Sequence, residues 1–118
     1  MKKTAGILLA STIATVALAV PTLGAGAQQT VRVNELDGRI ALSARPKSGA
    51  VKFVVRNRGD DAHDFWVRGG GKRWKTRVLI PGKAATLTVR LKKGVRYSFW
   101  CGVSDHAEDG MRGSFVAR

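Results

Sequence analysis

The feature that most constrains this fold is a succession of short alternating segments, separated by turn signals at intervals of roughly 8 to 12 residues. Within each segment apolar side chains occupy every second position, as Val51, Phe53 and Val55 do, which places them on one face of a strand. The chain shows neither an internal repeat nor an apolar stripe at helical spacing. The pattern predicts an all-β fold, a small sandwich or barrel.

The expected extended segments can be placed between turn dipeptides. Asp37-Gly38 separates the first two and predicts a hairpin, and Pro81-Gly82 and Lys93-Gly94 mark later turns. We expect strands within residues 30–34, 39–44, 51–57, 63–68, 86–91, 95–101 and 113–117.

The N-terminus has the three parts of a secretory signal. Lys2 and Lys3 precede an apolar run over residues 5–20, and small residues end at Ala27. A membrane anchor is the alternative, but an anchor needs about 20 apolar residues, and Pro21 and polar side chains interrupt this run. We therefore predict a cleaved signal peptide, residues 1–27, a mature domain, residues 28–118, without a membrane span, and a periplasmic or extracellular location.

Charge and cysteine content limit the function further. Loss of Lys2 and Lys3 lowers the formal net charge from +13 to +11, which favours acidic partners or an anionic cell surface without naming one. The one cysteine, Cys101, excludes an internal disulfide and sites that need several thiolates. In an exported protein such a thiol is buried, bound to metal or paired between chains.

The residues that carry chemistry lie near the C-terminus. Cys101, His106 and Met111 form the pattern C-x4-H-x4-M, which puts a thiolate, an imidazole and a thioether on one loop. One more imidazole completes the His2Cys set with a weak axial Met that holds mononuclear blue copper. His63 is the other histidine of the chain, and its strand phase places it on an apolar face, as it does Cys101. Singly, each of these residues is equally typical of a buried core position.

The chain resembles the cupredoxins in three motifs, VVRNRGDDAHDFWV, IPGKAATLTVRLKKGVRYSFWC and CGVSDHAEDGMRGSFVAR, within residues 51–118. The terminal loop is similar in spacing to those of auracyanin and rusticyanin. The resemblance implies a Greek-key β-sandwich and one type 1 copper ion that carries single electrons between redox partner proteins. It implies His63, Cys101 and His106 as equatorial ligands, Met111 as the axial ligand, and His106 as the exposed edge for electron exchange.

The chain departs from the family pattern beside the ligands. Asp64 stands where an Asn often ties the two ligand loops together, Gly102 replaces a frequent Ser or Thr, and Ser104-Asp105 replaces a common Pro-Gly. Outer hydrogen bonds orient metal ligands and set their properties. The contacts around the ligands are therefore not predictable from the resemblance.

A monomeric electron carrier, not an enzyme, is the expected function, because catalysis at a metal needs an open coordination position. Trp100, next to Cys101, is either a second electron route or a packed aromatic residue. Two alternatives stay open. A copper carrier uses the same soft ligands, and a basic β-domain with Trp66, Trp74 and Trp100 among cations can bind nucleic acid, although export argues against the latter.

The acidic residues suggest an orientation. Six of the eight lie within five residues of a proposed ligand, whereas basic residues are spread over the rest. We predict an acidic copper end on a basic body. The simple alternative is that loop acids serve turn chemistry alone. The six are Asp60, Asp61, Asp64, Asp105, Glu108 and Asp109.

Overall fold

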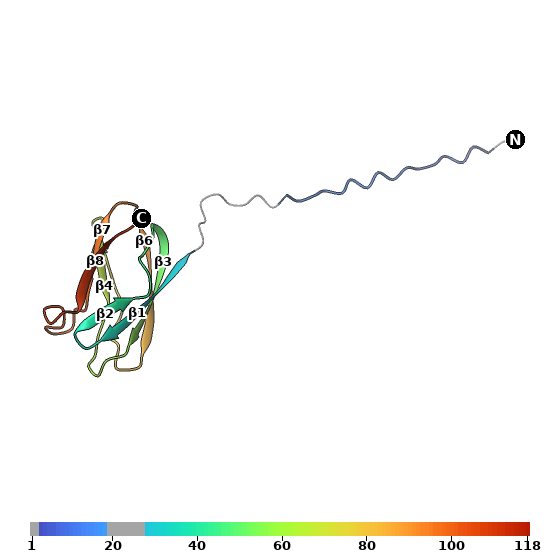
Figure 1. The fold of residues 1–118 in the computed structure, drawn as a ribbon. Helices are drawn as coiled ribbons and strands as arrows, with labels where there is room; N and C mark the ends of the chain where they lie inside the picture. The colour runs from blue at the N-terminus through green and yellow to red at the C-terminus, as the bar shows by residue number, and fades with distance from the viewer. Residues whose placement is uncertain (1–2, 19–27) are drawn as a thin grey trace.

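The computed structural model describes residues 3–18 and 28–118, and all its strands lie in the second range (Figure 1). The strands are β1 (Gln29–Leu36), β2 (Arg39–Leu42), β3 (Gly49–Asn57), β4 (Trp66–Gly69), β5 (Lys72–Lys75), β6 (Ala84–Leu91), β7 (Arg96–Trp100) and β8 (Arg112–Val116).

Two four-stranded sheets form a sandwich, with strand orders β2-β1-β3-β6 and β5-β4-β7-β8 (Figure 1). β1 and β3 run parallel, and the other neighbouring pairs are antiparallel. A parallel pair cannot be joined by a tight hairpin, so β2 lies between β1 and β3 in sequence but at the sheet edge in space. The all-β sandwich expected from the alternation is confirmed.

The core lies between the two sheets and is built from the alternating side chains. Phe53 on β3 packs on Phe65 and Phe115, with ring centroids 5.5 and 6.5 Å apart, so aromatic contacts cross from one sheet to the other. Burial of each such side chain contributes about 1.5–3 kcal/mol. These contacts hold β3 of one sheet against β8 and the segment before β4 of the other.

The strand expected over residues 63–68 is shorter than predicted. β4 begins only at Trp66, and His63 forms a single bridge with Leu79, through N–H···O bonds of 3.0 and 2.6 Å in the two directions. Asp64, which a regular strand over residues 63–68 would turn away from the face of His63, is buried. The reason is that its carboxylate accepts two hydrogen bonds, described below, which turn the chain out of regular pairing.

β5 was not among the expected strands. Its sequence, KRWK, carries one apolar side chain, so the alternation is too short to detect. It pairs with β4 through a tight turn in which Gly70 and Gly71 have φ values of +59° and +76°. Two consecutive positive φ values are typical of the turn that closes a two-residue hairpin.

The predicted signal peptide is only partly described. Residues 3–18 contain no helix or strand and expose their large apolar side chains, while the predicted cleavage position at Ala27 lies outside the described residues. Over 3–18 and 28–118, no helix has the length and apolar character required to cross a membrane. The division at residue 27 stays a prediction.

Candidate metal centre

Three of the four predicted ligand residues converge at one end of the sandwich. The Nδ1 atoms of His63 and His106 are 3.1 Å apart, and the Sγ atom of Cys101 lies 3.8 and 3.7 Å from them. A point about 2 Å from all three atoms exists in such a triangle, which is the length of metal–nitrogen bonds and close to that of metal–sulfur bonds. The three side chains are therefore spaced to bind one metal ion together.

His63 is the most tightly held of the three. It is 1% exposed, its backbone pairs with Leu79, and its Nε2 donates to Oδ1 of Asp37 at 2.8 Å. A proton on Nε2 leaves the lone pair of Nδ1 free to face the other ligand atoms. The bond to Asp37 thus fixes both the ring orientation and the tautomer that metal binding requires.

Asp37 was predicted only as a turn residue, so its role at the site was missed. Its carboxylate also accepts the backbone N–H groups of Asp60 at 2.9 Å and Asp61 at 3.2 Å. These two bonds, and then the bond from His63, hold the pKa of Asp37 below its usual value. The β1–β2 turn is therefore tied to the loop that carries His63, a contact that no local sequence signal reveals.

Gly59 makes this contact possible. A Cβ atom at this position would collide with the carboxylate of Asp37 and lie 2.8 Å from Nε2 of His63. Gly59 follows the end of β3. Here the backbone passes directly against the hydrogen-bonded pair, where a side chain has no room.

Cys101 follows β7 and is fully buried. Burial raises the pKa of its thiol, while the backbone N–H groups of Asp64 and Val103 donate to Sγ and act in the opposite direction, and the nearby acids Asp64 and Glu35 raise it again. The N–H donors stabilise a thiolate, which is the form that binds metal. The site thus offers the sulfur both a dry environment and two fixed dipoles.

His106 lies on the loop between β7 and β8 and is more open than His63. Its side chain is 19% exposed, and its Nε2 is 3.9 Å from Oδ2 of Asp61. The loop is held at its start by His106 N–H donating to Val103 O at 3.1 Å. One imidazole of the cluster therefore has an edge close to solvent.

Met111 closes the same loop. It is fully buried, its N–H donates to His106 O at 3.0 Å, and its carbonyl accepts from Cys101 N–H at 3.0 Å. The structure brings the backbone of Met111 next to the two other loop residues. Its predicted role as the axial ligand stays a proposal.

Asp64 ties the two ligand loops together despite replacing the expected Asn. Its Oδ1 accepts Gly102 N–H at 2.6 Å, and its Oδ2 accepts the indole N–H of Trp66 at 2.9 Å. A Cβ at position 102 would lie 2.5 Å from that indole nitrogen, so the tryptophan leaves space only for glycine. The unusual Asp64 and Gly102 thus belong to one arrangement that also includes Trp66.

Glu35 is a second acidic residue that the sequence reasoning missed. It continues the inward face of β1 after Val31 and Val33 and is fully buried, and within residues 3–18 and 28–118 neither of its carboxyl oxygens has a hydrogen-bond partner. Burial, and then the charge of Asp64, raise its pKa to about 8. The alternation along β1 places position 35 on the core face, and this is the one sequence feature from which its burial could have been predicted.

Comparison with solved structures identifies the fold of the chain. Auracyanin from Roseiflexus castenholzii superposes with a TM-score of 0.64 over 79% of this chain and 99% of its own, at 17% identity. Auracyanin B gives 0.66 over 78% and 89%, at 18% identity. Auracyanin A, a "blue" copper protein from Chloroflexus aurantiacus, gives 0.63 over 77% and 99%, at 14% identity. The chain has the cupredoxin fold.

No protein-family model matches the chain, and no curated protein sequence does. The fold predicted from the three motifs is confirmed by the structural matches, which at these identities concern architecture. The function follows from the residues of the metal centre themselves.

Proposed function

We propose that this chain is an exported blue copper protein that carries single electrons between redox partners. The observation that carries the proposal is the triangle of Nδ1, Nδ1 and Sγ atoms from His63, His106 and Cys101, with sides of 3.1, 3.7 and 3.8 Å. The structural likeness to auracyanins, one of them described as a "blue" copper protein, supports it.

The donor set fits copper better than the common alternatives. One thiolate with two imidazoles and a buried thioether nearby matches the trigonal blue copper set, whereas structural zinc sites have four strong ligands. We assign His63, Cys101 and His106 as equatorial ligands and Met111 as the axial one. Bound copper supplies a Cu(I)/Cu(II) couple that takes up or releases one electron.

The protein itself holds the ligand side chains rigidly and keeps water away from the sulfur ligand. Asp37 fixes the ring of His63, the N–H groups of Asp64 and Val103 hold the sulfur, and two backbone bonds at Met111 close the loop. Such a cage keeps the same ligand positions in both oxidation states. This favours electron transfer over catalysis and over a copper carrier, which must release its metal readily.

Export completes the proposal. The charged start, apolar run and small residues of positions 1–27 support a signal peptide, and hence a periplasmic or extracellular location. The redox partners are proteins, and the carrier is proposed to act as a monomer.

The test is the visible and EPR spectrum of the protein after Cu(II) is added, with Cys101→Ala as control. We expect an intense thiolate-to-copper band in the red region and a narrow copper hyperfine splitting, both lost in the variant. An ordinary copper splitting with a weak absorption band would reject the proposal.

A further inference from the structure

The outer face of the sheet β5-β4-β7-β8 carries a continuous row of large side chains. Strand register places Lys75, Trp66, Trp100 and Arg112 opposite one another on the four neighbouring strands. A second row, with Arg73 and Arg68 on β5 and β4, runs beside the first. We call this surface, defined by Lys75, Trp66, Trp100, Arg112, Arg73 and Arg68, the tryptophan face.

The tryptophan face has a single sign of charge. The strands β4, β5, β7 and β8 contain no acidic residue, and Arg96 on β7 adds to the cations. The exposed acids of the chain lie instead in the turn and loops near the metal centre, at Asp37, 60–61 and 105–109. The exposed acids near the metal centre thus border a strongly basic flank of the same end of the molecule.

Three cations of this face, Arg68, Arg73 and Lys75, lie over the indole rings. The rings of Trp66 and Trp100 stack with centroids 5.7 Å apart and an interplanar angle of 16°. Arg73 and Lys75 lie over Trp66 at 5.3 and 4.9 Å, and Arg68 lies over Trp100 at 5.9 Å. Cation–π contacts of this kind restrict long side chains and leave their outer N–H groups free for carboxylates.

The same contacts decide what class of partner fits. A nucleic acid needs a free indole face on which a base stacks, but each of these indoles already stacks on the other and has a cation over its ring. Trp74, the third tryptophan suggested for base stacking, packs against the core instead. Oriented guanidinium groups are suited to carboxylates, which they bind with two parallel hydrogen bonds.

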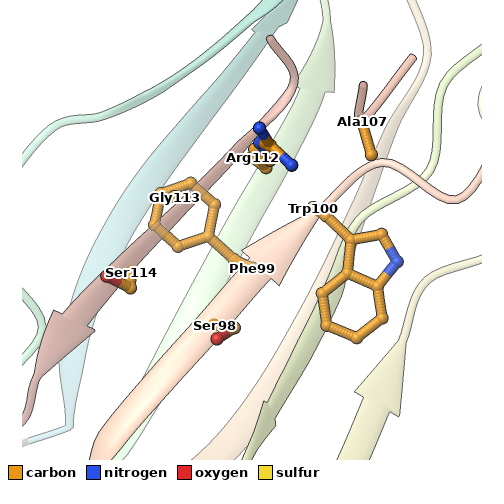
Figure 2. A pocket seen from close by; sticks show the side chains of 7 residues that line it. All are labelled: Ser98, Phe99, Trp100, Ala107, Arg112, Gly113 and Ser114. Carbon is orange, nitrogen blue, oxygen red and sulfur yellow. The ribbon is translucent and has the colours of Figure 1, made fainter. Parts of the chain in front are cut away.

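Two hollows lie on this sheet. One, of about 490 Å³, is lined by Ser98, Trp100, Arg112 and Ser114, with Ala107 of the following loop at one end (Figure 2). The other, of about 480 Å³, is lined by Arg68 and Arg73 beside the β4–β5 turn. Each hollow presents an arginine, so an acidic side chain from a partner can enter it.

The tryptophan face is joined directly to the metal centre. Trp100 precedes Cys101, and the indole N–H of Trp66 donates to Asp64, the neighbour of His63. A partner bound here is therefore held beside two of the three converging ligands.

We propose that the tryptophan face docks an acidic surface of a redox partner protein, a cluster of Asp and Glu carboxylates that Arg68, Arg73 and Arg112 bind. The partner's role in electron transfer rests on the proposed function, whereas the binding of carboxylates does not. A docked carboxylate cluster neutralises these cations without displacing the stacked indoles.

The experiment is a titration of the isotope-labelled protein with poly-L-glutamate, followed by NMR. We expect the indole N–H signals of Trp66 and Trp100 to shift, while that of the inward-facing Trp74 stays fixed. Arg68→Glu with Arg73→Glu weakens binding about tenfold or more. The matched control, Arg56→Glu with Arg90→Glu, makes the same charge change on exposed positions of the other sheet and weakens binding far less.

Equal losses in the two double variants would overturn the proposal, because net charge alone would then explain binding. Tighter binding of a single-stranded oligonucleotide or of phosphatidylglycerol vesicles than of poly-L-glutamate would assign the face to nucleic acid or membrane instead. The titration needs no copper, so a protein that lacks the blue spectrum but binds poly-L-glutamate at this face rejects the proposed function and keeps the docking surface.

Discussion

His63 and His106 present the same Nδ1 atom to the same point from opposite environments. His63 is 1% exposed and donates to Asp37 at 2.8 Å, whereas His106 is 19% exposed and lies 3.9 Å from the nearest carboxylate oxygen of Asp61. The first distance is a strong charge-assisted hydrogen bond, and the second is not a hydrogen bond. The site thus has an inner side that fixes geometry and an outer side that gives access.

The largest expected effect comes from removing each imidazole in turn. His63→Gly and His106→Gly both abolish the blue spectrum, but added imidazole restores it at a much lower concentration in His106→Gly, because only that position opens to solvent. The measurement is the red absorption band as a function of imidazole concentration. Equal rescue of the two variants would contradict the distinction between the inner and outer sides.

A smaller effect is expected from the carboxylates behind the rings. Asp37→Asn removes the charged acceptor of His63 Nε2–H and lowers copper affinity about 10- to 100-fold, the usual range for such partners. Asp61→Asn, the matched control at 3.9 Å from His106, changes it by less than about threefold. Competition with a chelator of known affinity measures both, and a larger loss in Asp61→Asn would reverse the assignment.

Asp37 also makes the inner side sensitive to acid. Since its pKa is lowered in the folded protein, its contribution to stability is present above its ordinary pKa of 3.8 and is lost as pH falls through the lower folded value. The free energy of unfolding of the wild type should therefore decline more steeply below pH 4 than that of Asp37→Asn. Urea titrations at several pH values measure it in both proteins. If the free energies of unfolding of the two proteins changed with pH in parallel, Asp37 would make no such contribution.

The buried carboxyl of Glu35 gives stability a pH dependence opposite in sign to that from Asp37. Its pKa is raised from 4.5 to about 8, so the folded state holds a proton that the unfolded state releases, and stability falls as pH rises from about 4.5 to 8. Glu35→Gln should remove this decline, which amounts to about 1.4 kcal/mol for each unit of pH over that range. Urea unfolding at pH 5 and pH 9 tests it, and an identical pH dependence in both proteins would show that the carboxyl is hydrated.

The smallest effect tests the link between the two loops. Gly102→Ala pushes the new methyl group against the indole nitrogen of Trp66 and strains its bond to Asp64, at a cost of about 1–3 kcal/mol in stability. Thermal unfolding measures this cost. A variant as stable as the wild type would show that the indole is free to move.

The sequence predicted the parts of this molecule that follow local rules. Most strands were predicted from the turn dipeptides and from the alternation of apolar side chains, as along 51–57 and 86–91. The metal centre was predicted from the residue types at Cys101, His106 and His63. These signals succeed because strand phase and ligand chemistry are each visible within a few residues.

The contacts missed by the sequence analysis are those between distant segments. Asp37 and Gly59 look like ordinary turn residues until the β1–β2 turn is seen against His63. Alternation with a period of two residues assumes a regular strand, and the two hydrogen bonds of the Asp64 carboxylate break that regularity. Glu35, which is buried without a hydrogen-bond partner among the described residues, breaks the rule that buried acids are paired.

The distance along the chain between the converging residues has a consequence for folding. His63 and His106 are 43 positions apart, and Asp37 lies a further 26 before His63. Contacts of such long sequence separation form late, because their loop-closure entropy must be offset by the rest of the fold. During refolding in the presence of copper, the blue colour would therefore develop only after the native topology is complete. The rate at which the copper band appears would then measure the last step of folding.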